Sequence, residues 1–220
     1  MASTYELIYG PVTGLGETSR ALLEYGRATW TPIDLPWADA VKKSPYGRVP
    51  VLRETTADGH VHVLVESRAI ERYLAKKFDL YGSNDLEAAR IDAYVSQWED
   101  LRWALVTRWK TPEGGNGEAR AASTEKADKE IRHLVSKHTQ SLAANAEGGG
   151  VHYVGSSTTW ADIAAYQSIK LFGLPFISQD KADEYREVLK AFDPLVQALE
   201  RDPEFARYLK DAEPRLASYQ

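Results

Sequence analysis

The 220-residue chain contains no cysteine, which excludes a disulfide framework and a thiolate nucleophile and argues against a thiol–disulfide reductase. If the protein handles thiols, the sulfur must arrive with a ligand. The chain also lacks an apolar run long enough to cross a membrane. It has no excess of basic charge, since 27 Lys and Arg stand against 32 Asp and Glu. The net charge of −5 argues against nucleic acid and anionic membranes as partners.

Three further patterns are missing. Residues 1–5 lack the basic and apolar regions of a secretory signal, so we expect a cytoplasmic location. The five histidines form no ligand-spaced cluster with acidic residues, and we therefore predict no metal. Gly14-Leu15-Gly16 is too short a match to a dinucleotide-binding fingerprint to predict such a cofactor.

Residues 1–80 alternate between strand and helix patterns. Short apolar runs predict strands at 5–9, 29–35, 51–54 and 61–65, the last two forming a hairpin around Asp58-Gly59. Pro32 indicates that the second strand lies at an edge of the sheet. Apolar residues at helical spacing predict helices at 17–27 and 67–78. This order predicts a mixed α/β domain.

Beyond residue 85 the pattern is helical throughout. Helices are predicted at 86–110, 118–145, 159–171, 181–192 and 203–209, with glycine-rich loops between some of them. We therefore predict two domains, an α/β domain at 1–80 and an all-helical domain at 86–220. Thr159 and Asp162 have the spacing of a capping box, so a change at Asp162 should affect folding more than chemistry.

Two segments of the first domain suit a peptide-like ligand. Val49-Pro50, directly before an apolar strand, predicts a tight turn, for which a cis bond is one solution. Such a turn leaves the backbone N–H and C=O of Val49 available to an extended ligand. Glu66-Ser67 precedes a helix, where a hydroxyl and unpaired N–H groups suit a carboxylate. An ordinary strand–turn–helix unit with an N-cap serine is the alternative interpretation.

Over nearly its whole length the chain resembles the cytosolic glutathione transferases. The Val49-Pro50 turn, the Glu66-Ser67 helix start and the Thr159–Asp162 cap all occur in the family's order. The resemblance implies a thioredoxin-like N-terminal domain with a mixed four-stranded sheet, followed by an all-helical domain that contributes the electrophile site. It also implies a homodimer that uses glutathione as co-substrate and needs no other cofactor.

The first strand resembles that of the tyrosine-type classes, and the sigma-like group most. In those classes the second tyrosine of a Tyr-x-Leu-x-Tyr strand activates the thiol, and an arginine follows eleven residues later. Here these positions are Tyr9 and Arg20, so the resemblance makes Tyr9 the candidate catalytic residue. A phenol that donates a hydrogen bond to the sulfur would lower the thiol pKa from about 8.5.

A serine-type variant is the rival hypothesis for the thiol-activating residue. Thr13, in the loop after Tyr9, also offers a hydroxyl. The chain differs from the tyrosine-type pattern at two positions, Gly10 and Leu15, where an aromatic residue and an arginine are usual. The spacing of Arg20 favours Tyr9.

The resemblance implies a glutathione site made by Trp37, Lys42, Lys43, Arg48, Val49, Pro50, Glu66, Ser67 and Asp100. In this assignment the Val49 backbone pairs with the cysteinyl moiety, and Glu66 and Ser67 hold the γ-glutamyl end. Trp37 lies near the glycyl end, with Lys42 or Lys43 at its carboxylate. Asp100 reaches the amino group across the dimer interface. Simple solvation of the lysines and of Asp100 is the alternative.

The electrophile site is less defined by the sequence. Trp103 and Thr107 share one helix face at their four-residue spacing. With Pro11 and Val12 they could form an apolar wall, although ordinary core or interface packing would explain the same residues.

We therefore predict an enzyme that conjugates the glutathione thiolate to small hydrophobic electrophiles, as in detoxification and xenobiotic metabolism. The alternative is a protein of the same fold that holds glutathione or apolar ligands without turnover, or a structural homodimer. Gly10 and Leu15 favour this alternative. Retention on a glutathione column without any conjugation activity would indicate it.

Overall fold

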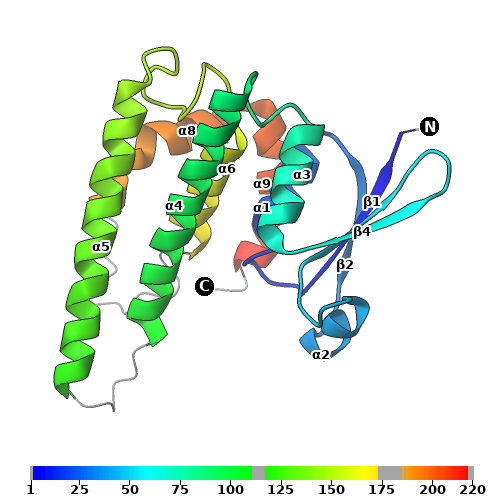
Figure 1. Ribbon diagram of the computed structural model, residues 1–220, viewed down its shortest axis with the longest axis horizontal. Coiled ribbons are helices and arrows are strands. Elements are labelled where there is room, and N and C mark those ends of the chain that lie inside the picture. The colour runs from blue at the N-terminus through cyan, green and yellow to red at the C-terminus, as the bar shows by residue number, and fades with distance from the viewer. Residues whose placement is uncertain (1, 111–116, 173–184, 186, 218–220) are drawn as a thin grey trace. The chain divides into compact units, whose positions relative to one another are not determined.

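The computed structural model describes residues 2–110, 117–172, 185 and 187–217. The chain forms two compact units (Figure 1). Unit 1 comprises residues 1–81 and 200–220, and unit 2 comprises residues 82–199. The predicted division into a glutathione-binding domain at 1–80 and an all-helical domain at 86–220 stays a prediction.

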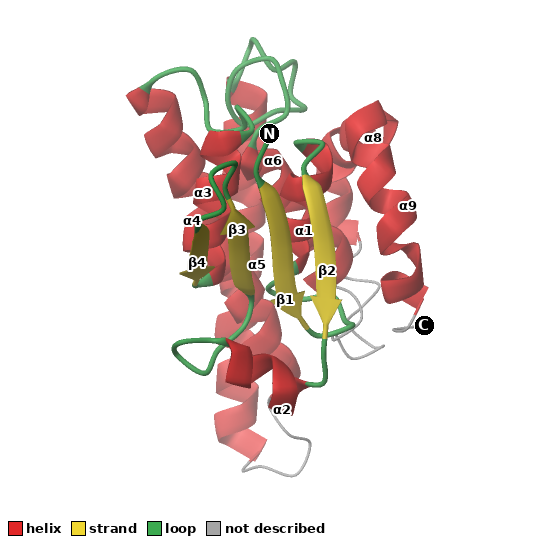
Figure 2. Cartoon of the chain, turned by 90° about the vertical axis from the view of Figure 1, so that its right-hand side faces the viewer, coloured by secondary structure: helices red, strands yellow, loops and turns green. Residues whose placement is uncertain are grey.

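Unit 1 is built on a mixed four-stranded sheet. Its strands are β1 (Thr4–Tyr9), β2 (Thr29–Asp34), β3 (Val51–Thr55) and β4 (Val61–Val65), in the order β2-β1-β3-β4 (Figure 2). β1 runs parallel to β2 and antiparallel to β3, and β3 is antiparallel to β4. The predicted mixed sheet is confirmed, and Pro32 does lie in an edge strand, where its missing N–H disrupts no ladder.

Side chains alternate across β1 and divide the core of unit 1 into two layers. Tyr5, Leu7 and Tyr9 belong to the side on which α1 (Glu17–Tyr25) and α3 (Ser67–Lys77) lie, behind the sheet in Figure 2. Ile8 packs on the other side with Ala40, the last residue of α2 (Trp37–Ala40), and with Val51. A 3₁₀ turn, η1 (Val41–Lys43), follows α2, and α9 (Pro203–Ala217) packs against α1.

Unit 2 is helical in its described part. Its elements are α4 (Asp85–Lys110), α5 (Gly117–Ala144), α6 (Trp160–Gln167), a π-helical segment η2 (Ser168–Phe172), a 3₁₀ turn η3 (Lys190–Phe192) and most of α8 (Asp193–Arg201). α4 packs against α5, α6 and η2. Trp98, Trp160 and Phe192 are fully buried in this unit. No helix among the described residues is long and apolar enough to span a bilayer.

The predicted capping box at the start of α6 is confirmed. The fully buried Asp162 carboxylate accepts bonds from the Thr159 N–H (2.7 Å) and hydroxyl (2.9 Å). Its other oxygen accepts the Tyr153 N–H at 2.8 Å. The carboxylate therefore joins the preceding loop to the helix, in addition to capping it.

Two of the element predictions need correction. The N-cap of α3 is Glu66 and not Ser67, which is the first helical residue. Within the predicted helix at 181–192, residues 181–184 and 186 lie outside the described part of the chain, residues 185 and 187–189 are helical, and Lys190–Phe192 form η3. The helix α8 (Asp193–Arg201) was not predicted. Pro194 occupies the first turn of α8, where its missing N–H costs no hydrogen bond.

Candidate functional site

Strand register brings the predicted thiol-activating and glutathione-binding segments to one end of the sheet. Ile8 pairs with Val51 and Val51 pairs with Val65. One residue further along, Tyr9 and Glu66 therefore flank the position of Pro50. Asp34, paired with Tyr9, ends β2 just before α2. The C-terminal ends of β1, β2 and β4 and the N-terminal end of β3 thus lie at the same end of the sheet, which we call the sheet-end site.

Tyr9 is buried at this end of the sheet and is held by contacts with Leu15 and Trp37. It is only 4% exposed, and its hydroxyl oxygen accepts a 2.9 Å hydrogen bond from the backbone N–H of Leu15. The Trp37 ring meets the Tyr9 ring edge-on, with centroids 5.2 Å apart and an interplanar angle of 87°. A hydroxyl that accepts one bond retains its own proton for donation. The phenol is therefore fixed in position and chemically able to act as a donor.

Residues 10–16, the Tyr9 loop, fit around this side chain through their glycines. A Cβ on Gly16 would lie 2.8 Å from the Tyr9 ring, and a Cβ on Gly14 would lie 2.7 Å from its hydroxyl oxygen. Gly14 also has a φ of +136°, a conformation that other residues rarely adopt. The Gly14-Leu15-Gly16 motif thus allows the backbone to approach Tyr9 closely, a role that its weak likeness to a nucleotide motif did not predict.

The two departures from the tyrosine-type pattern have physical explanations. A side chain at Gly10 would begin 3.3 Å from the Trp37 ring, which already occupies that space. Leu15 replaces the usual arginine, but its backbone N–H supplies a donor to the Tyr9 oxygen. Neither departure therefore removes the means of holding the phenol.

Arg20 holds the Tyr9 loop through hydrogen bonds to its backbone. Its fully buried guanidinium donates to the carbonyls of Gly10 and Val12, both at 2.9 Å. It also forms ion pairs with Glu17 and Asp34, both at 2.7 Å, and lies 5.5 Å from the centroid of the Tyr9 ring. A buried charge with several hydrogen-bonded partners fixes the segments it joins. The sequence did not reveal that Glu17 and Arg20 are both fully buried.

The entry to β3 and the start of α3 complete the sheet-end site. The Val49–Pro50 bond is cis, and Val49 lies outside the strand ladder, which begins at Val51. Glu66 has φ +70°, a conformation that costs a non-glycine residue about 1–3 kcal/mol. Its exposed side chain makes no cap bond to α3, and the Glu66 carbonyl accepts the N–H groups of Ala69 and Ile70. The N–H groups of Ser67 and Arg68 come before Ala69, the first residue whose N–H bonds to the Glu66 carbonyl, and so have no acceptor within the helix.

The other predicted residues of unit 1 lie at the surface or in the Tyr9 loop. Lys42 pairs with Asp39 at 2.8 Å and is largely exposed, as are Lys43 and Arg48. Pro50 is buried. In the Tyr9 loop Pro11 is exposed and Val12 half-buried, whereas Thr13, the rival thiol-activating residue, is 6% exposed.

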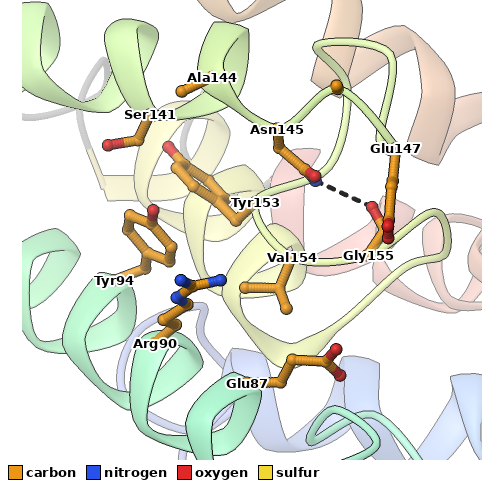
Figure 3. A pocket seen from close by; sticks show the side chains of 11 residues that line it. Glu87, Arg90, Tyr94, Ser141, Ala144, Asn145, Glu147, Tyr153, Val154 and Gly155 are labelled. Carbon is orange, nitrogen blue, oxygen red and sulfur yellow. Dashed lines mark hydrogen bonds between the residues drawn. The ribbon is translucent and has the colours of Figure 1, made fainter.

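The predicted residues of unit 2 lie on α4. Asp100 is exposed, and Trp103 is 52% exposed, with the Arg102 guanidinium 5.8 Å from its ring. The side chain of Thr107 lies outside the described part of the chain. A separate hollow of about 540 Å³ in this unit is lined by Arg90, Tyr94, Tyr153 and neighbouring residues (Figure 3), none of them a predicted site residue.

No group of three or more His or acidic residues that could hold a metal occurs within the described ranges. The sheet-end site offers a phenol, backbone N–H and C=O groups and a helix start. These groups can bind an extended peptide with a carboxylate and donate to an atom beside Tyr9.

The fold and the sheet-end site define a thioredoxin-like domain followed in sequence by a helical region. The pattern of the family described as "Glutathione S-transferase, N-terminal domain" matches residues 23–83, and that of "Glutathione S-transferase, C-terminal domain" matches residues 105–212. The chain belongs to the glutathione S-transferase family of enzymes, as predicted, with glutathione as co-substrate.

Individual relatives agree with this assignment. "Glutathione S-transferase 1" of Ascaris suum is 31% identical over 170 residues, 75% of this chain and 78% of the relative. "Probable glutathione S-transferase 6" of Caenorhabditis elegans is 29% identical over 204 residues, 90% and 92% of the two chains. A solved sigma-class transferase of Fasciola hepatica has the same fold, with a TM-score of 0.66 at 23% identity, covering 99% of this chain and 95% of that one.

Proposed function

We propose that this transferase conjugates glutathione to small hydrophobic electrophiles and that the Tyr9 hydroxyl activates the thiol. The observation that carries the proposal is the register that brings Tyr9, Val49 and Glu66 to one edge of the sheet. A tripeptide lying along this edge would have its cysteine between the phenol and the free backbone of Val49.

In this proposal Tyr9 donates a hydrogen bond to the sulfur and favours the thiolate. A free thiol with a pKa of about 8.5 is only a few per cent ionised at neutral pH. A lowering of about 2 units, equivalent to about 2.7 kcal/mol, would make the thiolate the main form. A charge-assisted bond from a fixed donor has the right magnitude for this. The thiolate would then attack the electrophile directly.

The start of α3 suits the γ-glutamyl carboxylate. Ser67 contributes a hydroxyl and an N–H at the positive end of an 11-residue helix. Glu66, with its strained φ, starts the helix without a side-chain cap. The Ser67 hydroxyl and N–H would therefore be available to a ligand. Val49 would pair with the cysteinyl backbone, and Trp37, packed on Tyr9, would border the glycyl end.

The remaining predicted roles are kept as parts of the same proposal. Lys42, Lys43 and Arg48 are exposed and could meet the glycyl carboxylate, and Asp100 would act across a homodimer interface. Pro11, Val12, Trp103 and Thr107 would border the electrophile. Membership of the sigma-like group, a role in detoxification and a cytoplasmic location belong here as well.

The proposal is tested by glutathione conjugation to an aryl halide in wild type, Tyr9→Phe and Thr13→Val. We expect Tyr9→Phe to lower kcat/KM by about 100-fold, the usual cost of one preorganised donor, while retention on a glutathione column persists. Thr13→Val should keep most activity. The reverse pattern would assign activation to Thr13. Retention by wild type without conjugation of any electrophile would favour the non-catalytic binding protein.

Ser67→Ala tests the binding half of the proposal. Loss of column retention in a variant with unchanged unfolding would support a carboxylate site at α3. Ser44→Ala is the matched control, because Ser44 lies in the same unit and its hydroxyl accepts only exposed backbone bonds from Tyr46 and Arg48. Equal retention of both variants would contradict the assigned site.

A further inference from the structure

The last helix of the chain contributes a side chain to the cluster beneath Tyr9. Tyr208 of α9 is 1% exposed, and its hydroxyl donates a 3.1 Å hydrogen bond to Oε1 of Glu17. Glu17 begins α1 and is fully buried. A buried carboxylate needs donors to compensate for its lost hydration, so Tyr208 has an electrostatic role as well as a packing role.

The second oxygen of Glu17 leads from Tyr208 to the Tyr9 loop. Oε2 accepts the Arg20 guanidinium at 2.7 Å, and the same guanidinium holds the Gly10 and Val12 carbonyls. One continuous series of buried polar contacts therefore runs from α9, through α1, to the loop whose backbone contacts the Tyr9 hydroxyl. Every member of this series lies within unit 1.

We propose that Tyr208 is a positioning residue for thiol activation, acting through Glu17 and Arg20 on the Tyr9 loop. The inference rests on the proposed role of Tyr9. Without the Tyr208 hydroxyl the Glu17 carboxylate loses a donor on Oε1, which weakens the constraint on its orientation. Because Arg20 pairs with that carboxylate and also bonds the loop, the loop carbonyls and the phenol lose part of their fixed geometry.

The expected effect falls on the thiol and not on glutathione binding. The proposed binding contacts lie at Val49, two residues before β3, and at Ser67, the first residue of α3, whereas the series of polar contacts runs through α9, α1 and the Tyr9 loop. A displaced phenol would stabilise the thiolate less, so the rising limb of the kcat/KM pH profile would move to higher pH. A merely structural residue would not move that profile.

The chain contains a matched control on the same pair of segments. The Tyr25 hydroxyl, at the other end of α1, donates a 2.7 Å bond to Asp202, the residue just before α9. Tyr25→Phe and Tyr208→Phe therefore each remove one tyrosine hydroxyl bond between the α1 and α9 segments. Tyr208→Phe removes the bond to Glu17, whereas Tyr25→Phe removes the bond to Asp202.

The test compares wild type, Tyr208→Phe, Tyr25→Phe and Tyr9→Phe by pH-dependent conjugation kinetics and by urea unfolding. For Tyr208→Phe we expect a fall in kcat/KM of about tenfold at neutral pH, as a small misplacement of a reacting group can cause. The pH midpoint should rise by about half a unit, with KM for glutathione within about twofold of wild type. Tyr25→Phe should lower stability alone.

Identical pH profiles and kcat/KM for Tyr208→Phe and Tyr25→Phe would overturn the inference. The parallel Tyr9→Phe measurement separates this outcome from failure of the proposed function. If Tyr9→Phe keeps full activity, the role of Tyr9 is wrong; if Tyr9→Phe is impaired and Tyr208→Phe matches its control, only the inference is wrong. Should Tyr208→Phe not fold, Glu17→Gln is measured against the same criteria, since it removes the carboxylate charge from the same contact.

Discussion

The backbone N–H of Leu15 donates a 2.9 Å hydrogen bond to the phenolic oxygen of Tyr9. A donor on this oxygen polarises the phenol, and linked hydrogen bonds strengthen one another. In the proposed function this contact would make the Tyr9 O–H a better donor to the glutathione sulfur. At this position the tyrosine-type pattern would place an arginine side chain. The chain uses its backbone instead, and the flanking glycines allow that approach.

Substitution of Gly16 tests this relationship by sterics alone. Gly16 has φ −83°, so alanine brings no backbone strain, but its Cβ would lie 2.8 Å from the Tyr9 ring. We expect Gly16→Ala to lower kcat/KM by about tenfold or more through displacement of the phenol. The matched control is Gly59→Ala, where φ is +84° and no atom lies within 4 Å, so stability falls and activity does not. Equal activity of the two variants would show that the close packing has no catalytic role.

Glu54 should make unit 1 sensitive to acid. Burial raises the pKa of this carboxyl, but hydrogen bonds from Tyr73, Ser3 and Lys77 outweigh burial and lower the pKa from 4.5 to about 2. A carboxylate whose pKa is lowered by folding stabilises the fold above its unfolded pKa, and that stabilisation is lost as the pH falls from about 4.5 to 2.

Urea unfolding of Glu54→Gln at a series of pH values checks this prediction. At neutral pH we expect a loss of at most about 3 kcal/mol, shrinking toward pH 2. Glu6→Gln is the control, because Glu6 is half exposed and lies 3.8 Å from Arg53 on the same sheet, so its effect should stay within about 0.5 kcal/mol. A constant difference between Glu54→Gln and wild type across the pH range would contradict the assignment.

His138 should make unit 2 respond to acid in a different range. The ring is fully buried, stacks on Trp98 at 4.5 Å and has two nitrogens without a hydrogen-bond partner among the described residues. Burial lowers the pKa of His138 from 6.5 to about 4. Between pH 6.5 and pH 4 the His138 ring is therefore protonated in the unfolded chain but neutral in the folded protein. The free energy of unfolding falls as the pH drops through this range.

The variant His138→Phe keeps an aromatic ring against Trp98 and removes both unpartnered nitrogens. We expect unfolding free energies equal to or above wild type at neutral pH, with an advantage that grows to about 3 kcal/mol by pH 4. His133→Phe, on the exposed side of α5, should show no such growth. An advantage for His138→Phe that does not depend on pH would indicate packing rather than titration.

Much of the sheet-end site could be predicted from the sequence because it depends on local signals. Pro50 and the hairpin around Gly59 delimit β3 and β4, and the register of these strands with β1 brings Tyr9, Val49 and Glu66 together. The capping box at Thr159 was predictable for the same reason, since its two residues are neighbours in sequence.

The contacts that hold Tyr9 were not predictable, because they depend on burial and on backbone geometry. The sequence does not show that Glu17 and Arg20 are both fully buried, or that Tyr208, 191 positions after Glu17, donates a hydrogen bond to its carboxylate. The Leu15 contact uses a backbone N–H, which every residue except proline has.

The most direct test is the ionisation of glutathione bound to the enzyme, followed by ultraviolet difference absorption of the thiolate as the pH is raised. Wild type should show a thiol pKa about 2 units below that of free glutathione, and Tyr9→Phe, which still binds the tripeptide, should return it close to the free value. The same lowered pKa in both proteins would contradict the role of Tyr9.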